Sequence, residues 1–146
     1  MTFTLEALKG DTNKKGGEFT PLPEGEHKAV LLGYSEKPNK KGTGIVGKLD
    51  FSLTDLKTST GEKRRVADFL NVVHDNPKAA EIAAGKLFKY LVSVGATDEA
   101  ALNVVNAEDR VKAIEEDYCF KPVIVRLKKD EKGEKKYVNI KEYIAV

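Results

Sequence analysis

The sequence predicts a mainly β fold with added helices, an α+β domain, on three observations. Residues 45–54 and 64–73 alternate apolar and polar side chains with the period of two that a half-buried strand shows. Residues 77–95 instead repeat their apolar side chains at steps of three and four, the period of an amphipathic helix. From residue 120 onward, two apolar runs flank a charged turn, which is typical of a β-hairpin.

The length and the charge balance limit what kind of protein this is. A chain of 146 residues fits one domain. Residues 1–18 are polar and lack a sustained hydrophobic period, so we expect a flexible N-terminal arm before a single domain at residues 19–146. Lysine plus arginine number 25 and aspartate plus glutamate 23, which excludes a strongly basic protein that coats duplex nucleic acid. A surface that binds anions must therefore arise by segregation of charge.

Three predicted strands occupy the first half of the domain. The first covers residues 26–34 after a proline-rich approach. The connection SEKPNKKGTG, residues 35–44, follows, and its proline, asparagine and glycines supply the dihedral angles of a turn. The second strand, residues 45–54, has the clearest alternation and places Phe51 in the core. A turn at residues 57–63 leads to the third strand.

The third strand has two faces, and both carry apolar residues. One face holds Val66, Asp68, Leu70 and Val72, and the other holds Arg65, Ala67, Phe69, Asn71 and Val73. Either set suits a half-buried strand. The sequence therefore leaves open which face looks toward the core.

A helix follows, with recognisable signals at both ends. Asn76 suits an N-cap, Pro77 suits the first helical position, and Gly95 is a stop signal. We expect two shorter helical pieces at residues 98–104 and 107–116, the second with acidic residues in its first turn.

The final hairpin completes an element order that has a functional meaning. It joins residues 120–127 to residues 137–146. Three strands, a helix and two strands is the order of a five-stranded OB-like barrel with a helix between strands three and four. That fold binds oligonucleotides and oligosaccharides on strands two and three, flanked by the loops that join strands one to two and four to five. Both of those loops are rich in lysine in this chain.

Single-strand binding without sequence preference requires a basic track for phosphates and aromatic faces on which bases stack. The two loops and their neighbouring strands offer both kinds of side chain. The phosphate-binding candidates are Lys37, Lys40, Lys41, Lys48, Arg65, Arg126 and Lys128. The stacking candidates are Tyr34, Phe69 and Tyr137, each beside a basic segment.

Each of these features also has an ordinary structural interpretation. Lysines protect exposed turns and strand edges, and aromatic side chains more often pack in a core. If Phe69 and Arg65 face inward, Phe69 packs and Arg65 must reach solvent or pair. The coincidence of basic charge in both loops is what favours the binding interpretation.

The stretch FTPLPEGEHKAVLLGYSEKPNKKGTGIVGKLDFSL, with the later GKLFKYLVSVGA and YVNIKEYI, resembles a family of small bacteriophage proteins formerly classed as a domain of unknown function. The resemblance covers roughly residues 19–146. It implies an OB-like protein that binds single-stranded DNA in phage DNA replication or recombination. Many proteins of that functional class end in an acidic tail that recruits partners, whereas this chain ends in EYIAV.

Enzymatic and membrane functions are not favoured. The sequence has no Walker loop, dinucleotide fingerprint or GxSxG elbow. His27 and His74 lie far apart and Cys119 is the only thiol, so we expect no enzyme activity, no metal site and no cofactor. A nuclease built on Asp50 and Glu134 is disfavoured, because a hairpin tip holds catalytic geometry poorly. The lone cysteine and the lack of a long apolar run predict a protein of the reducing cytoplasm, here that of the host cell, with no membrane segment.

Two alternatives to DNA binding stay open at this point. The near-neutral charge and the apolar end YIAV suit a non-enzymatic adaptor that binds a recombinase or a host enzyme. RNA is the other alternative, because base stacking does not select the sugar. Partners among phage replication or recombination proteins, and a homo-oligomer, are compatible with either function.

Overall fold

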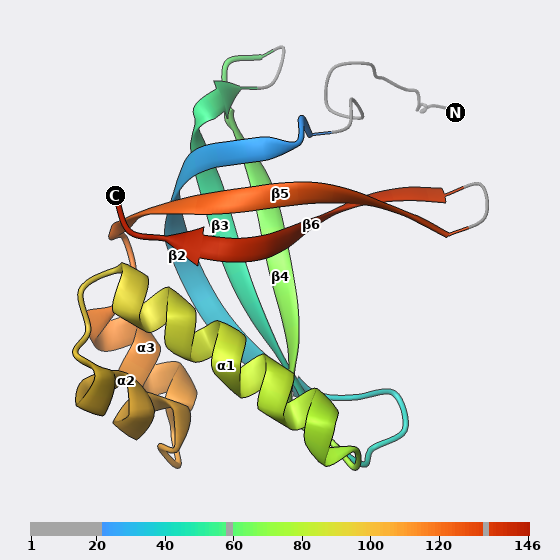
Figure 1. The fold of residues 1–146 in the computed structure, drawn as a ribbon, viewed down its shortest axis with the longest axis vertical. Helices are drawn as coiled ribbons and strands as arrows, with labels where there is room; N and C mark the ends of the chain where they lie inside the picture. The colour runs from blue at the N-terminus through green and yellow to red at the C-terminus, as the bar shows by residue number, and fades with distance from the viewer. Residues whose placement is uncertain (1–21, 58–59, 133–134) are drawn as a thin grey trace, which may run out of the picture.

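The computed structural model describes residues 22–57, 60–132 and 135–146, and side chains 130–137 lie outside that description. The expected arm at residues 1–18 falls outside it as well. In chain order, the described elements are β2 (Gly25–Pro38), β3 (Ile45–Lys57), β4 (Lys63–Val73), α1 (Pro77–Ser93), α2 (Asp98–Val105), α3 (Arg110–Asp117), β5 (Pro122–Lys132) and β6 (Lys135–Ile144) (Figure 1).

The five described strands form one antiparallel sheet in the order β4-β3-β2-β5-β6. The prediction of a mainly β fold with helices is therefore confirmed. The predicted five-stranded OB-like barrel is not closed in the structure, because β4 and β6 are the two edges of the sheet and no ladder joins them among the described residues. Three helices follow the third strand, where the predicted barrel has one. α2 and α3 occupy the two places where short helices are expected.

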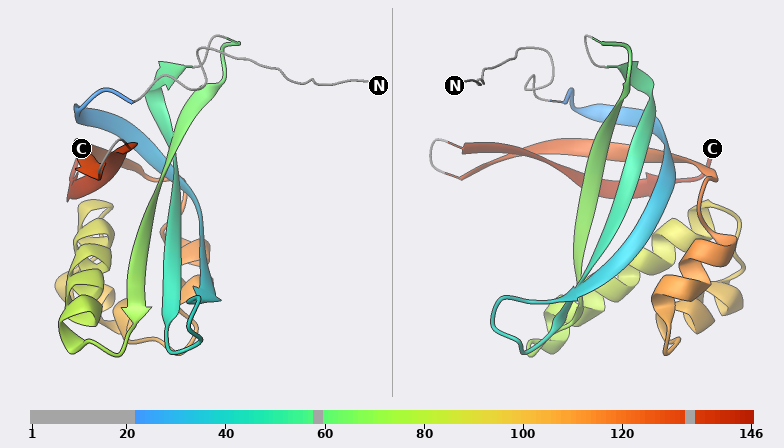
Figure 2. Two further views of the ribbon diagram at one scale, coloured as in Figure 1. Left: turned by 90° about the vertical axis from the view of Figure 1, so that its right-hand side faces the viewer. Right: turned by 180° about the vertical axis from the view of Figure 1, so that it is seen from behind.

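The sheet is strongly bent, and β2 carries the bend. β2 pairs with β5 through residues 25–30 and with β3 through residues 29–38, with a bulge between Leu31 and Gly33. Bulges increase local twist and redirect a strand. The β5–β6 hairpin consequently crosses β3 and β4 at a steep angle, as Figures 1 and 2 both show.

The core lies on the inner side of this bend, between the sheet and the helices. Leu49, Phe51 and Leu53 of β3 are fully buried, as the alternation predicts. Phe51 packs against Tyr90 of α1 and Tyr143 of β6, with ring centroids 5.6 Å apart in both pairs. Aromatic rings at such separations add stabilisation to the area they bury. Sequence alternation thus assigns the inner face of β3 correctly.

The structure also settles which face of β4 is inside. Val66, Asp68 and Leu70 are buried, whereas Phe69 is 64% exposed and Arg65 is exposed. Phe69 and Arg65 therefore look outward, on the face away from the core. The sequence alone does not decide this point, because Asp68 is a charged residue on the inner face.

A side-chain cluster joins α1 to β4 and β6, the two edges of the sheet; we call it the seam cluster, formed by Asp68, Lys86 and Tyr143. The ammonium of Lys86 lies 3.0 and 2.8 Å from the two carboxylate oxygens of Asp68 and donates to the carbonyl of Ile140 at 2.6 Å. The Tyr143 hydroxyl donates to Asp68 at 2.6 Å. Side-chain bonds thus connect the two sheet edges in place of a backbone ladder.

α1 starts and ends where its signals predict. The Asn76 side chain accepts a hydrogen bond from the Lys78 N–H at 2.9 Å, and Pro77 is the first helical residue. Gly95 follows the C-cap with φ of 111°, the left-handed conformation that glycine adopts without strain. No helix in the described part of the chain is long and apolar enough to cross a membrane.

Candidate nucleic-acid interface

None of the described helices covers the outer face of β3 and β4, and the right-hand view of Figure 2 looks onto this face. Strand register places three outward residues in one row across this face. Ser35 of β2 pairs with Lys48 of β3, and Lys48 pairs with Phe69 of β4. The row brings a lysine and an exposed aromatic ring together, although they are far apart in the sequence.

A groove of about 410 Å³ runs along this row toward the loop at residues 39–44. We call it the basic groove; it is lined by Ser35, Lys37, Pro38, Asn39, Lys40, Val46, Lys48 and Phe69. Three of these residues are lysines and none is a carboxylate. Since exposed lysines attract phosphate and no lining acid opposes them, the groove is suited to a polyanion.

Lys48 and Phe69 form the part of the basic groove that suits a nucleotide best. The Lys48 ammonium stands 5.9 Å from the centroid of the Phe69 ring, within cation–π distance. The ring remains 64% exposed, so a planar base has a face on which to stack.

The loop at residues 39–44 is held in shape by its asparagine. The Asn39 backbone N–H donates to the Gly44 carbonyl at 2.9 Å, and its side-chain oxygen accepts from the Thr43 N–H at 3.0 Å. Gly42 has φ of 72°, a conformation that favours glycine. The bonds position Lys40 in the groove, while Lys41 is exposed beside it and does not line it.

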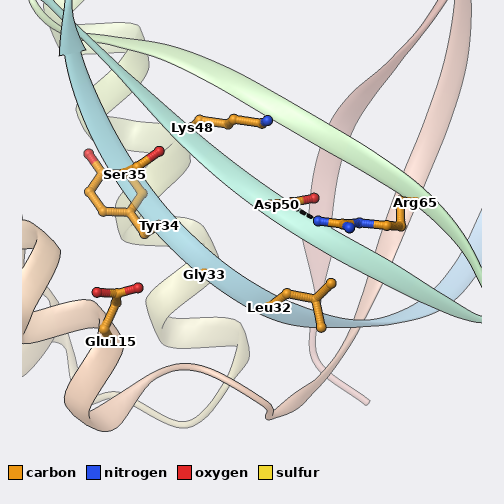
Figure 3. Close-up of a pocket in the computed structure, with 8 residues that line it drawn as sticks. All are labelled: Leu32, Gly33, Tyr34, Ser35, Lys48, Asp50, Arg65 and Glu115. Carbon is orange, nitrogen blue, oxygen red and sulfur yellow. Dashed lines mark hydrogen bonds and ion pairs between the residues drawn. The ribbon is translucent and has the colours of Figure 1, made fainter.

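A second hollow of about 300 Å³ lies farther along the same face (Figure 3). We call it the mixed-charge hollow; it is lined by Leu32, Gly33, Tyr34, Ser35, Lys48, Asp50, Arg65 and Glu115. Arg65 forms an ion pair with Asp50 across the two strands, as the dashed line in Figure 3 marks. The predicted phosphate contact from Arg65 therefore competes with an acid already bound to it.

Tyr34 is placed differently from the prediction. Its ring is only 2% exposed, and its hydroxyl donates to Glu36 at 2.6 Å. Burial, with the neighbouring Glu36 carboxylate, raises the pKa of the Tyr34 hydroxyl well above its usual range. Tyr34 is a core residue in this structure and offers no stacking face, so we leave it out of the interface.

The buried hydroxyl of Tyr34 belongs to a link between β2 and α3. Arg110 donates to both oxygens of Glu36, at 2.7 and 3.2 Å. Although burial alone would lower the pKa of Arg110, the bonds to Glu36 raise it. No local sequence pattern indicates this link, because Glu36 and Arg110 belong to distant segments that meet only in the fold.

Arg126 and Lys128 line a separate pocket, which we call the hairpin pocket; its other lining residues are Glu24, Gly25, Leu127 and Lys141. Arg126 forms an ion pair with Glu142 on the neighbouring strand. The structure therefore does not bring these two predicted residues into the basic groove. The Tyr137 side chain lies outside the described residues.

Of the predicted site residues, Lys37, Lys40, Lys48 and Phe69 come together in one groove. Ser35, Asn39 and Val46 also line it and were not predicted. The alternation in β3 could have predicted Val46, because Val46 and Lys48 are two residues apart and so lie on the same face of the strand. Among the residues that the structure describes, no group of three or more His, Cys, Asp or Glu side chains is arranged to hold a metal ion.

No protein-family model matches the chain, and a comparison with curated proteins finds no match either.

Proposed function

We propose that this chain is a non-enzymatic protein that binds single-stranded DNA without sequence preference. The basic groove carries the proposal, because it combines three lysines with an exposed phenylalanine and has no carboxylate among its lining residues. Lysines supply attraction to phosphates, and a ring face is tolerant of base identity. The phosphate contacts are assigned to Lys37, Lys40 and Lys48, and the stacking contact to Phe69.

The OB-like interpretation belongs to the same proposal. The basic groove is lined by residues of the first three described strands, β2, β3 and β4, and of the loop that joins β2 to β3. This is the face on which that fold binds oligonucleotides. From the resemblance to phage proteins we infer a role in replication or recombination of phage DNA in the host cytoplasm, with phage replication or recombination proteins as partners.

The test is fluorescence anisotropy of a labelled oligothymidine of about 30 nucleotides, titrated at several salt concentrations with duplex and RNA as competitors. We expect log affinity to fall linearly with log salt, by about 0.7 per phosphate neutralised. Binding that ignores salt, or that duplex displaces as well as single strand does, would contradict the proposal.

Variants assign the binding to the groove. Phe69→Ala should weaken binding by about 1–3 kcal/mol, the usual contribution of one stacked base. Lys48→Gln should lower the salt slope by about 0.7. Lys112→Gln on α3 and Leu102→Ala on α2 are matched controls, since both side chains are exposed outside the groove. Equal effects in controls and groove variants would place the binding elsewhere.

The adaptor alternative is favoured by one observation outside the groove. Phe120 is 70% exposed and holds φ of 61°, while its N–H donates to the Leu31 carbonyl at 2.9 Å. A bulky residue in the left-handed region is uncommon and is often found at functional sites. A protein partner lost from Phe120→Ala, together with no binding of oligothymidine by the wild type, would favour the adaptor over the DNA-binding protein.

A further inference from the structure

The basic groove does not end at Phe69. That residue also lines a pocket of about 470 Å³ at the open edge of the sheet, where residues of β4, α1 and β6 meet. We call it the edge pocket; its lining includes Asp68, Phe69, Ile82, Lys86 and Lys141. Because Phe69 lines both, the groove and the edge pocket adjoin at this side chain.

The edge pocket in turn adjoins the hairpin pocket. Lys141 of β6 lines both, and the hairpin pocket, with a volume of about 600 Å³, also holds Arg126 and Lys128. The three pockets therefore form a series from the loop at residues 39–44, over the edge of β4, to the β5–β6 hairpin. This loop and this hairpin extend to the same side of the molecule in Figures 1 and 2.

Charge distinguishes this route from the other exit of the groove. The edge and hairpin pockets are lined by two carboxylates, Asp68 and Glu24, and by four cationic side chains, Lys86, Arg126, Lys128 and Lys141. Lys86 binds Asp68, and Arg126 pairs with Glu142, so the lining keeps a positive balance. The mixed-charge hollow, which shares Lys48 with the groove, balances Lys48 and Arg65 against Asp50 and Glu115. A polyanion that leaves the groove is attracted toward the edge pocket and is not attracted toward the hollow.

The geometry points to a continuous path for one nucleic-acid strand, from the basic groove over the edge of β4 into the hairpin pocket. Lys141 meets a phosphate at the junction, and Ile82, which is 60% exposed, offers an apolar surface to a base. This path rests on the proposed function. It adds the route of the strand across the surface and two contact residues, Ile82 and Lys141. It also gives Arg126 and Lys128 a role at the far end of a longer strand.

The first test is the dependence of affinity on length, using oligothymidines of about 4 to 20 nucleotides, which spans the site sizes known for such domains. The affinity of the Lys141→Gln variant should stop rising beyond a certain oligothymidine length. The affinity of the wild type should continue to rise beyond that length. For the longest strand, Lys141→Gln should lower the salt slope by about 0.7, and for the shortest it should not. Lys112→Gln removes the same charge from α3 and should match the wild type in both respects.

The second test uses a fluorescent reporter, because the chain contains no tryptophan. Ile82→Trp places a single indole on the proposed path. An oligothymidine of about 20 nucleotides, longer than the largest such sites of about 16, should quench its fluorescence by stacking. Leu102→Trp, on exposed α2, should not be quenched. Both the length effect and the quenching are required, so the loss of either one overturns the path.

The outcomes separate this path from the proposed function. If the wild type binds and Phe69→Ala weakens it, but Lys141→Gln behaves like Lys112→Gln at every length, the function stands and the path is wrong. If Arg65→Gln, in place of Lys141→Gln, limits the gain with length, the strand crosses the mixed-charge hollow and the path is again wrong. No binding by the wild type at low salt overturns both.

Discussion

Two lysines meet neighbouring residues of β4 on its two sides, and their surroundings give them different roles. Lys48 stands over the exposed ring of Phe69 on the outer face, whereas Lys86 binds the buried carboxylate of Asp68 on the inner side. Adjacent strand residues point to opposite faces, so one step along β4 separates a solvent groove from the core. The exposed Lys48 is available to a ligand in the basic groove, whereas Lys86, bound to a buried acid, holds the fold together.

The largest expected effect is the loss of stability when Lys86, on the inner side of β4, is removed. Lys86→Ala leaves Asp68 buried without its cation and should lower the free energy of unfolding by about 2–4 kcal/mol, allowing for the part-exposed lysine. Lys48→Ala should stay within about 0.5 kcal/mol of wild type, because it is exposed. Urea denaturation measures both. Similar losses in the two variants would mean that the lysines do not differ as described.

Gly47, next to Lys48 in β3, tests how tightly the inner side is packed. A Cβ at this position would lie 2.4 Å from the hydroxyl oxygen of Tyr34 and 2.9 Å from its ring. Tyr34 is held by burial and by Glu36, so Gly47→Ala should cost about 1–3 kcal/mol of unfolding free energy by overpacking. Thermal and urea unfolding both report it. A neutral result would show that the Tyr34 ring moves freely.

Tyr143 gives the seam cluster a pH dependence. Burial, followed by the charge of Asp68 and the hydrogen bond to it, raises the pKa of the Tyr143 hydroxyl well above its usual value. The Tyr143 hydroxyl is neutral when protonated, and its pKa is higher in the folded chain than in the unfolded chain. Its contribution to the free energy of unfolding is therefore complete below about pH 10, the pKa of an unperturbed tyrosine, and is lost as the pH rises further. Tyr143→Phe should cost about 1 kcal/mol at neutral pH and flatten the alkaline decline. Unfolding curves of the wild type and of Tyr143→Phe, recorded from neutral to alkaline pH, measure this effect. If both proteins lose stability in parallel as the pH rises, Tyr143 does not cause the decline.

The smallest expected effect is a gain in oligothymidine binding when the ion pair on the outer face of β3 and β4 is removed. Asp50→Asn releases Arg65 in the mixed-charge hollow and should strengthen oligothymidine binding by about 0.2–1 kcal/mol, the range of exposed ion pairs. Glu116→Gln on α3 removes a charge of the same sign away from the lining residues and serves as the control. Anisotropy at low salt measures both variants. A larger gain from Glu116→Gln would indicate a general charge effect.

The strands and helices are predictable from local sequence, and the arrangement of the sheet is not. Alternation identifies β3 and its buried face, and Asn76, Pro77 and Gly95 mark both ends of α1. These signals work because backbone geometry repeats over a few residues. The open edges of the predicted OB-like barrel could not be predicted, because closure depends on how β4 and β6 meet, and there the seam cluster joins the edges by side chains.

The candidate site divides in the same way. The sequence by itself determined the lysine-rich loop at residues 39–44, the turn residues that shape it, and the shared face of Arg65 and Phe69. Only the tertiary structure decided that this face looks outward, that Tyr34 is buried, and that Arg65 meets Asp50. The reason is physical: turn chemistry and alternation act between near neighbours, whereas burial and ion pairing depend on which distant strand or helix is packed alongside.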